Sequence, residues 1–221
     1  MFDNIIPLIP EIYLSIGQTF LMVSLSLIAA IIIGTPLGVF VYVTESGSIQ
    51  ENSTLNRILN YTINLIRSFP FIILLVVLIP FTRFLIGTTV GPLAASVSLS
   101  IAAIPFFARL VEQALKDVPA GTIEAAVALG APKRLIIKDV LLNEARSGII
   151  LALTVTAISF ISYSAVAGIV GGGGIGDLAI RYGYYRFQTD VMIAMVILLI
   201  MIVQCVQFIG NFSAKKLDRR Y

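Results

Sequence analysis

The sequence lacks histidine and tryptophan, has a single cysteine, and carries a charge on only 12% of its 221 residues. Cys205 has no second cysteine to pair with, which excludes an internal disulfide. Without histidine, or carboxylates clustered at ligand spacing, the sequence argues against a metal site and against the commonest acid–base chemistry. The motif Gly-x-x-x-x-Gly-Lys-Ser/Thr is also absent, so the chain has no phosphate cradle. We therefore expect no catalytic residue, no metal, no cofactor and no enzymatic activity in this chain.

Apolar residues dominate instead, because 58% of the sequence is hydrophobic and the mean hydropathy is +0.98. These values are typical of a polytopic membrane protein, which we expect to be all-α and to form one domain over residues 1–221. A helix needs about 20 predominantly apolar residues to cross a bilayer. The sequence therefore predicts five transmembrane helices, at about residues 14–44, 59–81, 90–112, 148–171 and 191–213.

The distribution of charge predicts the orientation in the membrane. Asp3 and Glu11 precede or begin the first span without any lysine or arginine, whereas basic residues are dense in the segment 117–146 and after the last span. Cytoplasmic segments are enriched in lysine and arginine, so we predict an external amino terminus, a cytoplasmic central loop and a cytoplasmic carboxyl terminus. The basic residues of that terminus are Lys215, Lys216, Arg219 and Arg220. Since topology accounts for the basic residues, the net charge of +3 indicates no nucleic-acid partner.

The polar segment between the third and fourth spans predicts two short helices joined by a sharp corner. Pro119 and Gly121 break the preceding helix, Glu124 then falls in the first turn of a new one, and Gly130 ends that helix about two turns later. Pro132 suits the first turn of the second helix. Small side chains make the first helix thin, so another protein's backbone can come close, and we interpret it as a docking element. The alternative is an amphipathic loop helix on the bilayer surface, with its basic residues near lipid head groups.

Polar residues inside the predicted spans are candidates for a translocation path. Arg67 lies about two turns inside the second span, beside Ser68, and exposure of its charge to lipid would cost several kcal/mol. The fourth span contains a hydroxyl-rich stretch that includes Ser159, Ser162 and Tyr163. Two copies of this stretch that face each other could line a water-filled path. Two alternatives stay open: Arg67 can reach the cytoplasmic lipid head groups instead of lining the path, and the hydroxyls can bond to their own helix backbone.

Three shorter patterns predict local structure. Gly34 and Gly38 flank Pro36, a spacing that permits close helix contact and a kink. Arg109 and Glu112 are three residues apart and can pair on one helix face. The glycine run at 171–176 matches Gly-x-Gly-x-x-Gly, but no βαβ unit surrounds it, so we reject a nucleotide site and predict flexible or span-ending backbone.

The segment Glu-Ala-Ala, followed after three residues by glycine, resembles the EAA loop of ABC-importer permease subunits. In that family the loop is cytoplasmic and fits into a groove of the ATP-hydrolysing subunit. The resemblance implies an ATPase-coupling role for five residues, namely Glu124, Ala125, Ala126, Leu129 and Gly130. The family pattern continues as Ile-x-Leu-Pro, where this sequence has Val140 to Asn143. Asn143 in place of proline leaves the exit geometry of the second loop helix open.

A closer resemblance, to methionine-importer permease subunits, extends over nearly the whole chain. The segments that carry it are 67–75, 79–83, 86–88, 105–112, 168–176 and 182–184. The resemblance implies a type I ABC-importer permease fold with five spans in the bacterial cytoplasmic membrane. It also implies a homodimer of this chain, two cytoplasmic ABC ATPase subunits, and an extracytoplasmic, usually lipid-anchored, binding protein that delivers L- or D-methionine.

Other function classes fit the residues less well. A permease for another amino acid or small nutrient is the nearest alternative. A secondary transporter would use intramembrane carboxylates, whereas the Asp and Glu residues here fall near span ends or in loops. An intramembrane enzyme would need a nucleophile with a base, or metal ligands. A structural assembly factor fits the composition but has no need of the Glu-Ala-Ala loop.

Overall fold

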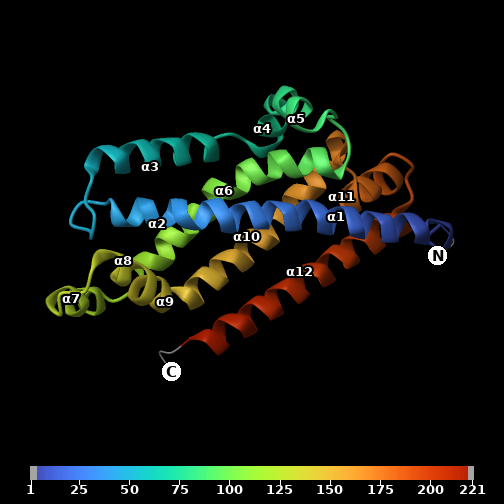
Figure 1. The fold of residues 1–221 in the computed structure, drawn as a ribbon. Coiled ribbons are helices and arrows are strands. Elements are labelled where there is room, and N and C mark those ends of the chain that lie inside the picture. The colour runs from blue at the N-terminus through green and yellow to red at the C-terminus, as the bar shows by residue number, and fades with distance from the viewer. Residues whose placement is uncertain (1–3, 219–221) are drawn as a thin grey trace.

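The computed structural model describes residues 4–218, and this part of the chain contains helices and no strand (Figure 1). The predicted all-α class is confirmed, while Arg219 and Arg220 lie outside the described residues. The α-helices are α1 (Ile9–Ala29), α2 (Thr35–Val43), α3 (Ser53–Arg67), α4 (Phe71–Val77), α5 (Ile79–Ile86), α6 (Pro92–Lys116), α7 (Ala120–Ala128), α8 (Lys133–Leu135), α9 (Leu142–Glu144), α10 (Arg146–Ala167), α11 (Gly174–Leu178) and α12 (Thr189–Leu217). Several of these helices are extended by turns of other helix types. One is a 3₁₀ turn at Ile6–Leu8, and four are π-helical turns at Ala30–Gly34, Ile136–Leu141, Gly168–Gly172 and Ala179–Tyr184.

Four helical stretches in the described chain are long and apolar enough to cross a membrane. They are Ile6–Val43, Pro92–Lys116, Arg146–Gly172 and Thr189–Leu217. A fifth exists if α3 and α4 count as one span, although the two helices meet at 97°. The predicted second span, 59–81, is therefore not one continuous helix. The helix α3 stops before Pro70, because helical geometry is disfavoured for the residue that precedes a proline. Pro70 itself has a ψ of 131°, which turns the chain away from the axis of α3.

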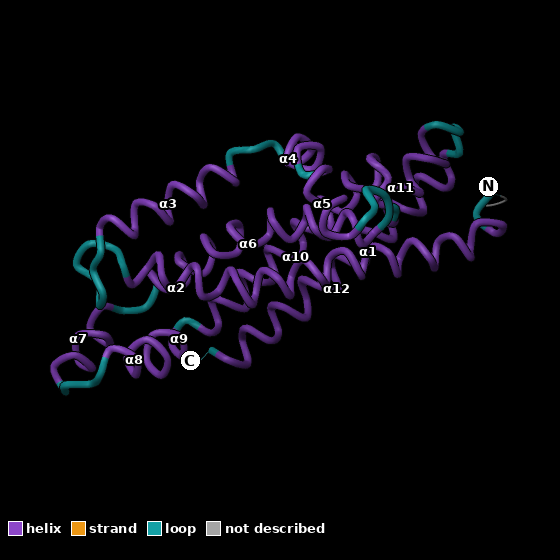
Figure 2. Tube along the Cα trace, turned by 45° about the horizontal axis from the view of Figure 1, so that its top comes forward, coloured by secondary structure: helices purple, strands orange, loops and turns teal. Residues whose placement is uncertain are grey.

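The long helices pack side by side along one direction (Figures 1 and 2). The central α6 contacts α1, α2 and α10, and α10 in turn contacts α12. Helices α7, α8 and α9 lie at one end of the molecule together with the last turn of α12, and we call this the loop end. The amino-terminal end of the described chain lies at the opposite end. The central loop and the carboxyl-terminal end of the described chain thus lie at the same end of the molecule.

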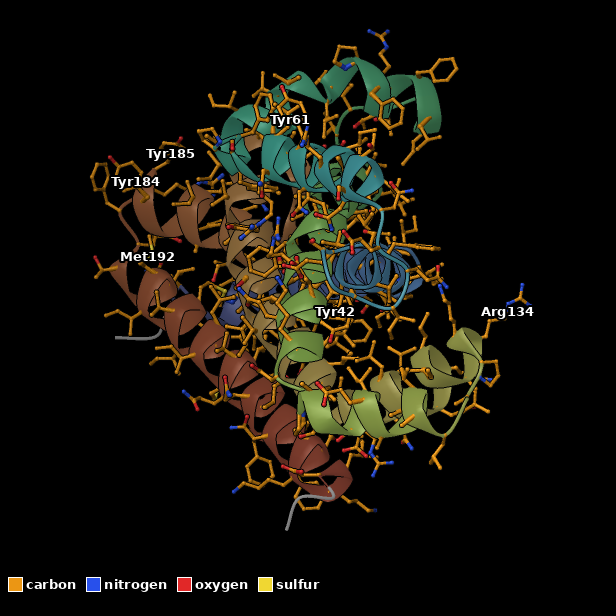
Figure 3. The ribbon with its side chains drawn as sticks, turned by 90° about the vertical axis from the view of Figure 1, so that its left-hand side faces the viewer. Tyr42, Tyr61, Arg134, Tyr184, Tyr185 and Met192 are labelled. Carbon is orange, nitrogen blue, oxygen red and sulfur yellow. The ribbon has the colours of Figure 1, made fainter. Side chains whose placement is uncertain are left out.

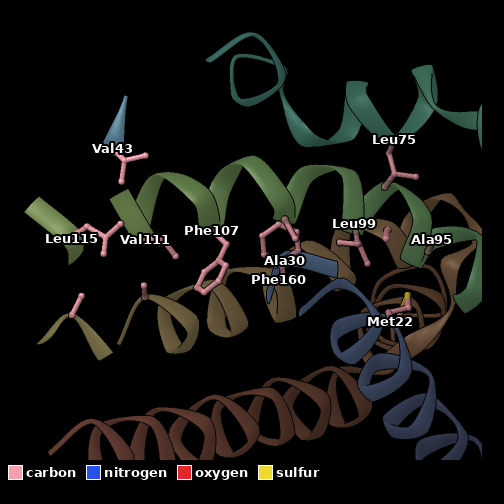
Figure 4. Close-up of a cluster of buried hydrophobic side chains, with 14 of the residues drawn as sticks. Met22, Ala30, Val43, Leu75, Ala95, Leu99, Phe107, Val111, Leu115 and Phe160 are labelled. Carbon is pink, nitrogen blue, oxygen red and sulfur yellow. The ribbon is translucent and has the colours of Figure 1, made fainter. Parts of the chain in front are cut away.

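The main hydrophobic core lies between α6, α10 and the first span (Figure 4). Its largest buried side chains are Met22, Leu99, Phe107, Leu115, Leu141 and Phe160. The face of α12 that points away from α10 stays apolar and exposed, with only 6% of its most hydrophobic stretch buried. Such a helix is stable in a bilayer, where lipid covers the apolar side chains.

Close contact between the first span and α6 depends on two glycines. A Cβ at Gly38 would lie 2.5 Å from the carbonyl oxygen of Ala108, and one at Gly34 would lie 2.8 Å from that of Ile104. Neither distance is compatible with a side chain, so the two backbones approach as the glycine spacing predicted. The wide turn at Ala30–Gly34 ends two residues before Pro36, which lacks an N–H and cannot complete the regular helical hydrogen-bond pattern.

The glycine run ends the fourth span, as predicted, and packs tightly against α1. Gly171 and Gly173 have φ values of +92° and +75°, which favour glycine, and they turn the chain from α10 into α11. The backbone N–H of Gly174 donates to Gln18 Oε1 at 2.7 Å, and that of Ile175 donates to Thr19 Oγ1 at 3.0 Å. Side chains of α1 therefore satisfy the free N–H groups at the start of α11.

Candidate functional site

The docking element predicted from the sequence is the short helix α7, which has no buried residue. Its predicted start was wrong, because α7 already begins at Ala120, directly after Pro119. Pro119, with a ψ of 129°, is sufficient to separate α7 from the end of α6. Glu124 therefore lies in the middle of α7 instead of its first turn, and Gly121 is helical and does not break the chain.

The carboxyl-terminal end of α7 has the hydrogen bonds of a Schellman motif. Gly130 has a φ of +74°, its N–H donates to the carbonyl of Val127 at 2.9 Å, and the N–H of Ala131 donates to that of Ala126 at 3.1 Å. This pair of bonds satisfies carbonyls that a helix end would otherwise leave free, and it needs a residue that tolerates positive φ. The prediction that Gly130 ends the helix is confirmed.

The surface of α7 is apolar, thin and exposed. Leu129 is 86% exposed and Val127 is 56% exposed, while Ala125 is also exposed and Ala126 is partly buried. Glu124 is exposed, and its carboxylate makes no hydrogen bond or ion pair within residues 4–218. Large apolar side chains displayed at the tip of a loop, next to an unpaired carboxylate, are typical of a surface that another protein covers.

The second loop helix, continuous from Lys133 to Glu144, anchors α7 to the rest of the protein. Ile136 and Leu141 are buried, and Leu141 belongs to the main core together with Leu115 at the end of α6. Arg134 points away from the body of the molecule (Figure 3). The helix thus has an apolar side that holds the loop in place and a basic side that faces outward.

Asn143, which stands where the family pattern has proline, is helical and joins the loop to α12. Its Oδ1 accepts a hydrogen bond from Arg146 Nη1 at 3.3 Å, and Arg146 Nε donates to the carbonyl of Leu217 at 2.8 Å. Ser147 Oγ also donates to the carbonyl of Ala214, at 3.1 Å. The chain therefore leaves the loop through a helical segment that is fastened to the last helix.

A charged network connects α6 with the neighbouring helices near the loop end. The buried carboxylate of Glu112 accepts from Arg109 at 2.5 Å and pairs with Lys116 at 3.0 Å, which confirms the predicted Arg109–Glu112 pair. Lys116 also pairs with Glu45, at 2.9 Å. Arg109 Nη2 donates to the amide oxygens of Asn60 and Asn64 on α3. The network links the helix that leads into the loop to both α3 and the end of α2.

A hollow of about 980 Å³ lies between α7 and the chain that follows α2. Tyr42 and Lys116 line its body side, and Ile123, Glu124 and Val127 line its α7 side. Tyr42 lies close to the end of α2 in Figure 3. Next to this space, α7 is a projecting knob that contacts the rest of the protein through Ile123 and the second loop helix.

The residues predicted for a translocation path are only partly brought together. Arg67 and Tyr163, from α3 and α10, line a common cavity of about 210 Å³. Ser68 is exposed and bonds to its own helix at the carbonyl of Asn64, and Ser162 bonds to the carbonyl of Ile158. Ser159 is partly buried. None of these three serines lines the cavity, and the bonds of Ser68 and Ser162 match the alternative of backbone satisfaction.

Sequence reasoning missed the groups that join distant segments. Glu45, Asn60 and Asn64 in the charged network are separated from their partners by 45 to 71 residues, and Gln18 is 156 residues from the backbone it caps. No local spacing reveals such pairs. The one available signal is polar side chains at the ends of otherwise apolar spans, where a buried polar group needs a partner.

Comparisons with known proteins give a consistent result. The family model for "Binding-protein-dependent transport system inner membrane component" matches residues 34–221. A "Probable D-methionine transport system permease protein MetI" of Vibrio cholerae is 45% identical over 203 residues, which are 92% of this chain and 90% of that protein. The "Methionine import system permease protein MetP" of Bacillus subtilis is 41% identical over 179 residues, 81% of each chain.

Solved structures share the fold. One in "Inward facing conformations of the MetNI methionine ABC transporter" has a TM-score of 0.94 and 41% identity, covering 96% of this chain and 99% of that one. A second, in "Crystal structure of an amino acid ABC transporter with histidines", has a TM-score of 0.78 at 18% identity, over 98% of both chains. The second likeness concerns the fold alone. The extent of the family match and the identity to full-length relatives lead to one conclusion: this chain belongs to the family of inner membrane components of binding-protein-dependent transport systems.

Proposed function

We propose that this chain is the membrane-spanning permease subunit of an ATP-driven importer for methionine, L or D. The observation that carries this proposal is the 41–45% identity, over most of the chain, to permease proteins named for methionine transport. The exposed helix α7 gives the proposal a mechanism. The chain has no phosphate cradle, so energy reaches it through contact with a separate ATPase.

In this mechanism α7 is the part that the ATPase subunit holds. Leu129 and Val127 fill an apolar groove, Ala125 and Ala126 allow close backbone approach, and Glu124 finds a polar or basic partner there. Burying exposed leucine and valine side chains contributes about 1.5–3 kcal/mol for each. The charge of Glu124, which has no partner within the described chain, fixes how α7 is aligned in the groove of the ATPase subunit.

Movement of α7 is transmitted through rigid connections. Leu141 packs the loop against α6, and the Glu112 network fastens α6 to α3, so a displacement at the loop moves several spans together. The α3–α4 break is a natural place for such motion to change the shape of the path. We assign two copies of this chain, two ATPase subunits and an external binding protein to the working importer.

The proposed orientation is amino terminus out and carboxyl terminus in, within the bacterial cytoplasmic membrane. It puts α7 and the basic side of the second loop helix on the side where ATP is available. The external loops then include the turn from α11 to α12, where a binding protein delivers methionine. Selection of the substrate begins on that delivering protein.

The test is ATP-dependent uptake of labelled methionine into vesicles that hold this chain with its ATPase and binding protein. We expect uptake by the wild type and its loss in Glu124→Lys, with the chain still inserted. Asp139→Lys is the matched control, because it makes the same charge reversal on the exposed side of the second loop helix. A stable ATPase complex without methionine uptake would overturn the substrate, and the absence of any ATPase complex would overturn the permease assignment.

A further inference from the structure

Arg67 is a charged side chain at an unusual depth. It is the last residue of α3, which starts at Ser53 near the loop end and runs alongside the other long helices, so the helical rise places Arg67 about 21 Å from Ser53, in the direction of the opposite end of the molecule. At such a depth an arginine faces water, protein or a ligand, because lipid would cost several kcal/mol. An ionisable residue inside the membrane is therefore a functional-site hypothesis by default.

Within residues 4–218 the guanidinium of Arg67 has no hydrogen bond and no ion pair, and the residue is exposed. Arg109, by contrast, is held by a carboxylate and two amide oxygens. The two arginines lie on adjacent helices, yet only Arg109 is satisfied by the fold. Arg67 thus keeps its donors available for an anionic group.

The cavity beside Arg67 has aromatic walls. Its volume is about 210 Å³, and its lining includes Phe71, Phe106, Phe160 and Tyr163. The rings of Phe71 and Tyr163 are stacked with centroids 4.7 Å apart, and Phe160 meets Tyr163 edge-on at 5.1 Å. These contacts hold the rings in fixed positions. Three separate elements, α4, α6 and α10, contribute rings, so the cavity is built by the tertiary structure.

We propose that this cavity is a substrate-binding site inside the membrane, at the break between α3 and α4, for an α-amino acid with an apolar side chain. The Arg67 guanidinium binds the carboxylate of the substrate, and the rings around Tyr163 contact its side chain. Guanidinium and carboxylate form strong, charge-assisted hydrogen bonds, and a thioether makes favourable contacts with aromatic rings. This proposal rests on the proposed function and adds a site at which the permease itself selects the substrate.

The size of the cavity favours a single amino acid. Pockets for drug-sized ligands typically measure about 300–1,000 Å³. A volume of about 210 Å³ is below that range and suits one small molecule. The cavity also has one cationic group and no carboxylate in its lining, so it suits a ligand with one anionic group.

The test is equilibrium binding of radiolabelled methionine to the purified permease–ATPase complex without the binding protein, with unlabelled methioninol, which lacks the carboxylate, as competitor. We expect saturable binding that methioninol does not displace. Arg67→Gln should weaken binding about tenfold or more and remove the preference for methionine over methioninol. Arg83→Gln, which removes an arginine outside the cavity lining, should bind as the wild type does. Tyr163→Leu should weaken binding while the preference for the carboxylate remains.

Three results would overturn the site. They are no methionine binding by a wild-type complex that transports methionine in vesicles, equal binding by Arg67→Gln and Arg83→Gln, and displacement by methioninol as effective as by methionine. In each of these the proposed function stands and only the site is lost. A wild-type complex that transports no methionine refutes the proposed function itself, and the site with it.

Discussion

Replacing Gly130 by alanine tests whether the backbone turn after α7 matters for docking. Gly130 and Gly121 both have open space where a Cβ would be added, with no heavy atom within 4 Å. They differ in backbone conformation, because Gly130 has a φ of +74° whereas Gly121 is helical. The two substitutions therefore add the same methyl group, one within α7 and one in the turn that ends it, and only the second strains the chain.

The expected magnitude follows from that strain. Holding alanine in the left-handed region costs about 1–2 kcal/mol, so Gly130→Ala favours opening of the turn and loss of its two Schellman hydrogen bonds. Docking must then restore the turn, and each loop loses about 5- to 30-fold in affinity for its ATPase subunit. Gly121→Ala instead favours the helical state by roughly 0.5–1 kcal/mol and should leave the affinity unchanged or slightly tighter.

The assay is the dissociation constant of labelled ATPase subunit for the permease in lipid nanodiscs, measured for the wild type and both variants. Circular dichroism of each variant checks that the transmembrane helices remain folded. Equal weakening by the two substitutions would refute the reasoning, because the added methyl group and not the backbone conformation would then be responsible. Unchanged affinity in Gly130→Ala would show that the turn is not part of the docking surface.

Three further substitutions test the packing and polar contacts. Gly38→Leu should prevent α2 from reaching α6 and abolish stable folding, whereas Gly17→Leu, with open space around it, should be tolerated, as size-exclusion profiles in detergent will show. Glu112→Gln removes the negative charge that pairs with Arg109 and should destabilise the protein by about 1–3 kcal/mol. We expect a lower melting temperature for this variant and an unchanged one for the exposed control Asp139→Asn. Thr19→Val removes the acceptor for the buried N–H of Ile175 at the start of α11 and should lower the stability of the fold by about 1–3 kcal/mol, with faster hydrogen exchange at that N–H. An unchanged melting temperature and exchange rate would contradict this assignment.

Local patterns predicted the parts of the molecule that depend on short-range chemistry. Gly130 ends α7 because positive φ at a helix end is a property of that residue and its two neighbours. The Arg109–Glu112 pair follows from a three-residue spacing on one helix face. The start of α7 was missed because Pro119 and Gly121 are both breaking signals, and only the proline has a non-helical conformation.

The second span shows where the sequence is insufficient. Its apolar run is long enough for one helix, and the proline in it was visible, but a proline can kink, break or begin a helix. The 97° angle between α3 and α4 depends on what the two pieces pack against.

The sequence by itself determined that this chain is an all-α membrane protein, where its long apolar helices lie, and that a polar loop with an exposed short helix separates the third span from the fourth. These properties follow from composition and from periodicity within one segment, and the bilayer enforces them because backbone polar groups must bond within the helix. The tertiary structure alone decided that Arg67 and Tyr163 line one cavity, that Arg109 contacts Asn60 and Asn64, and that Gln18 caps α11. Each of these joins residues far apart in the chain, and their proximity results from how the helices pack and not from any spacing along the sequence.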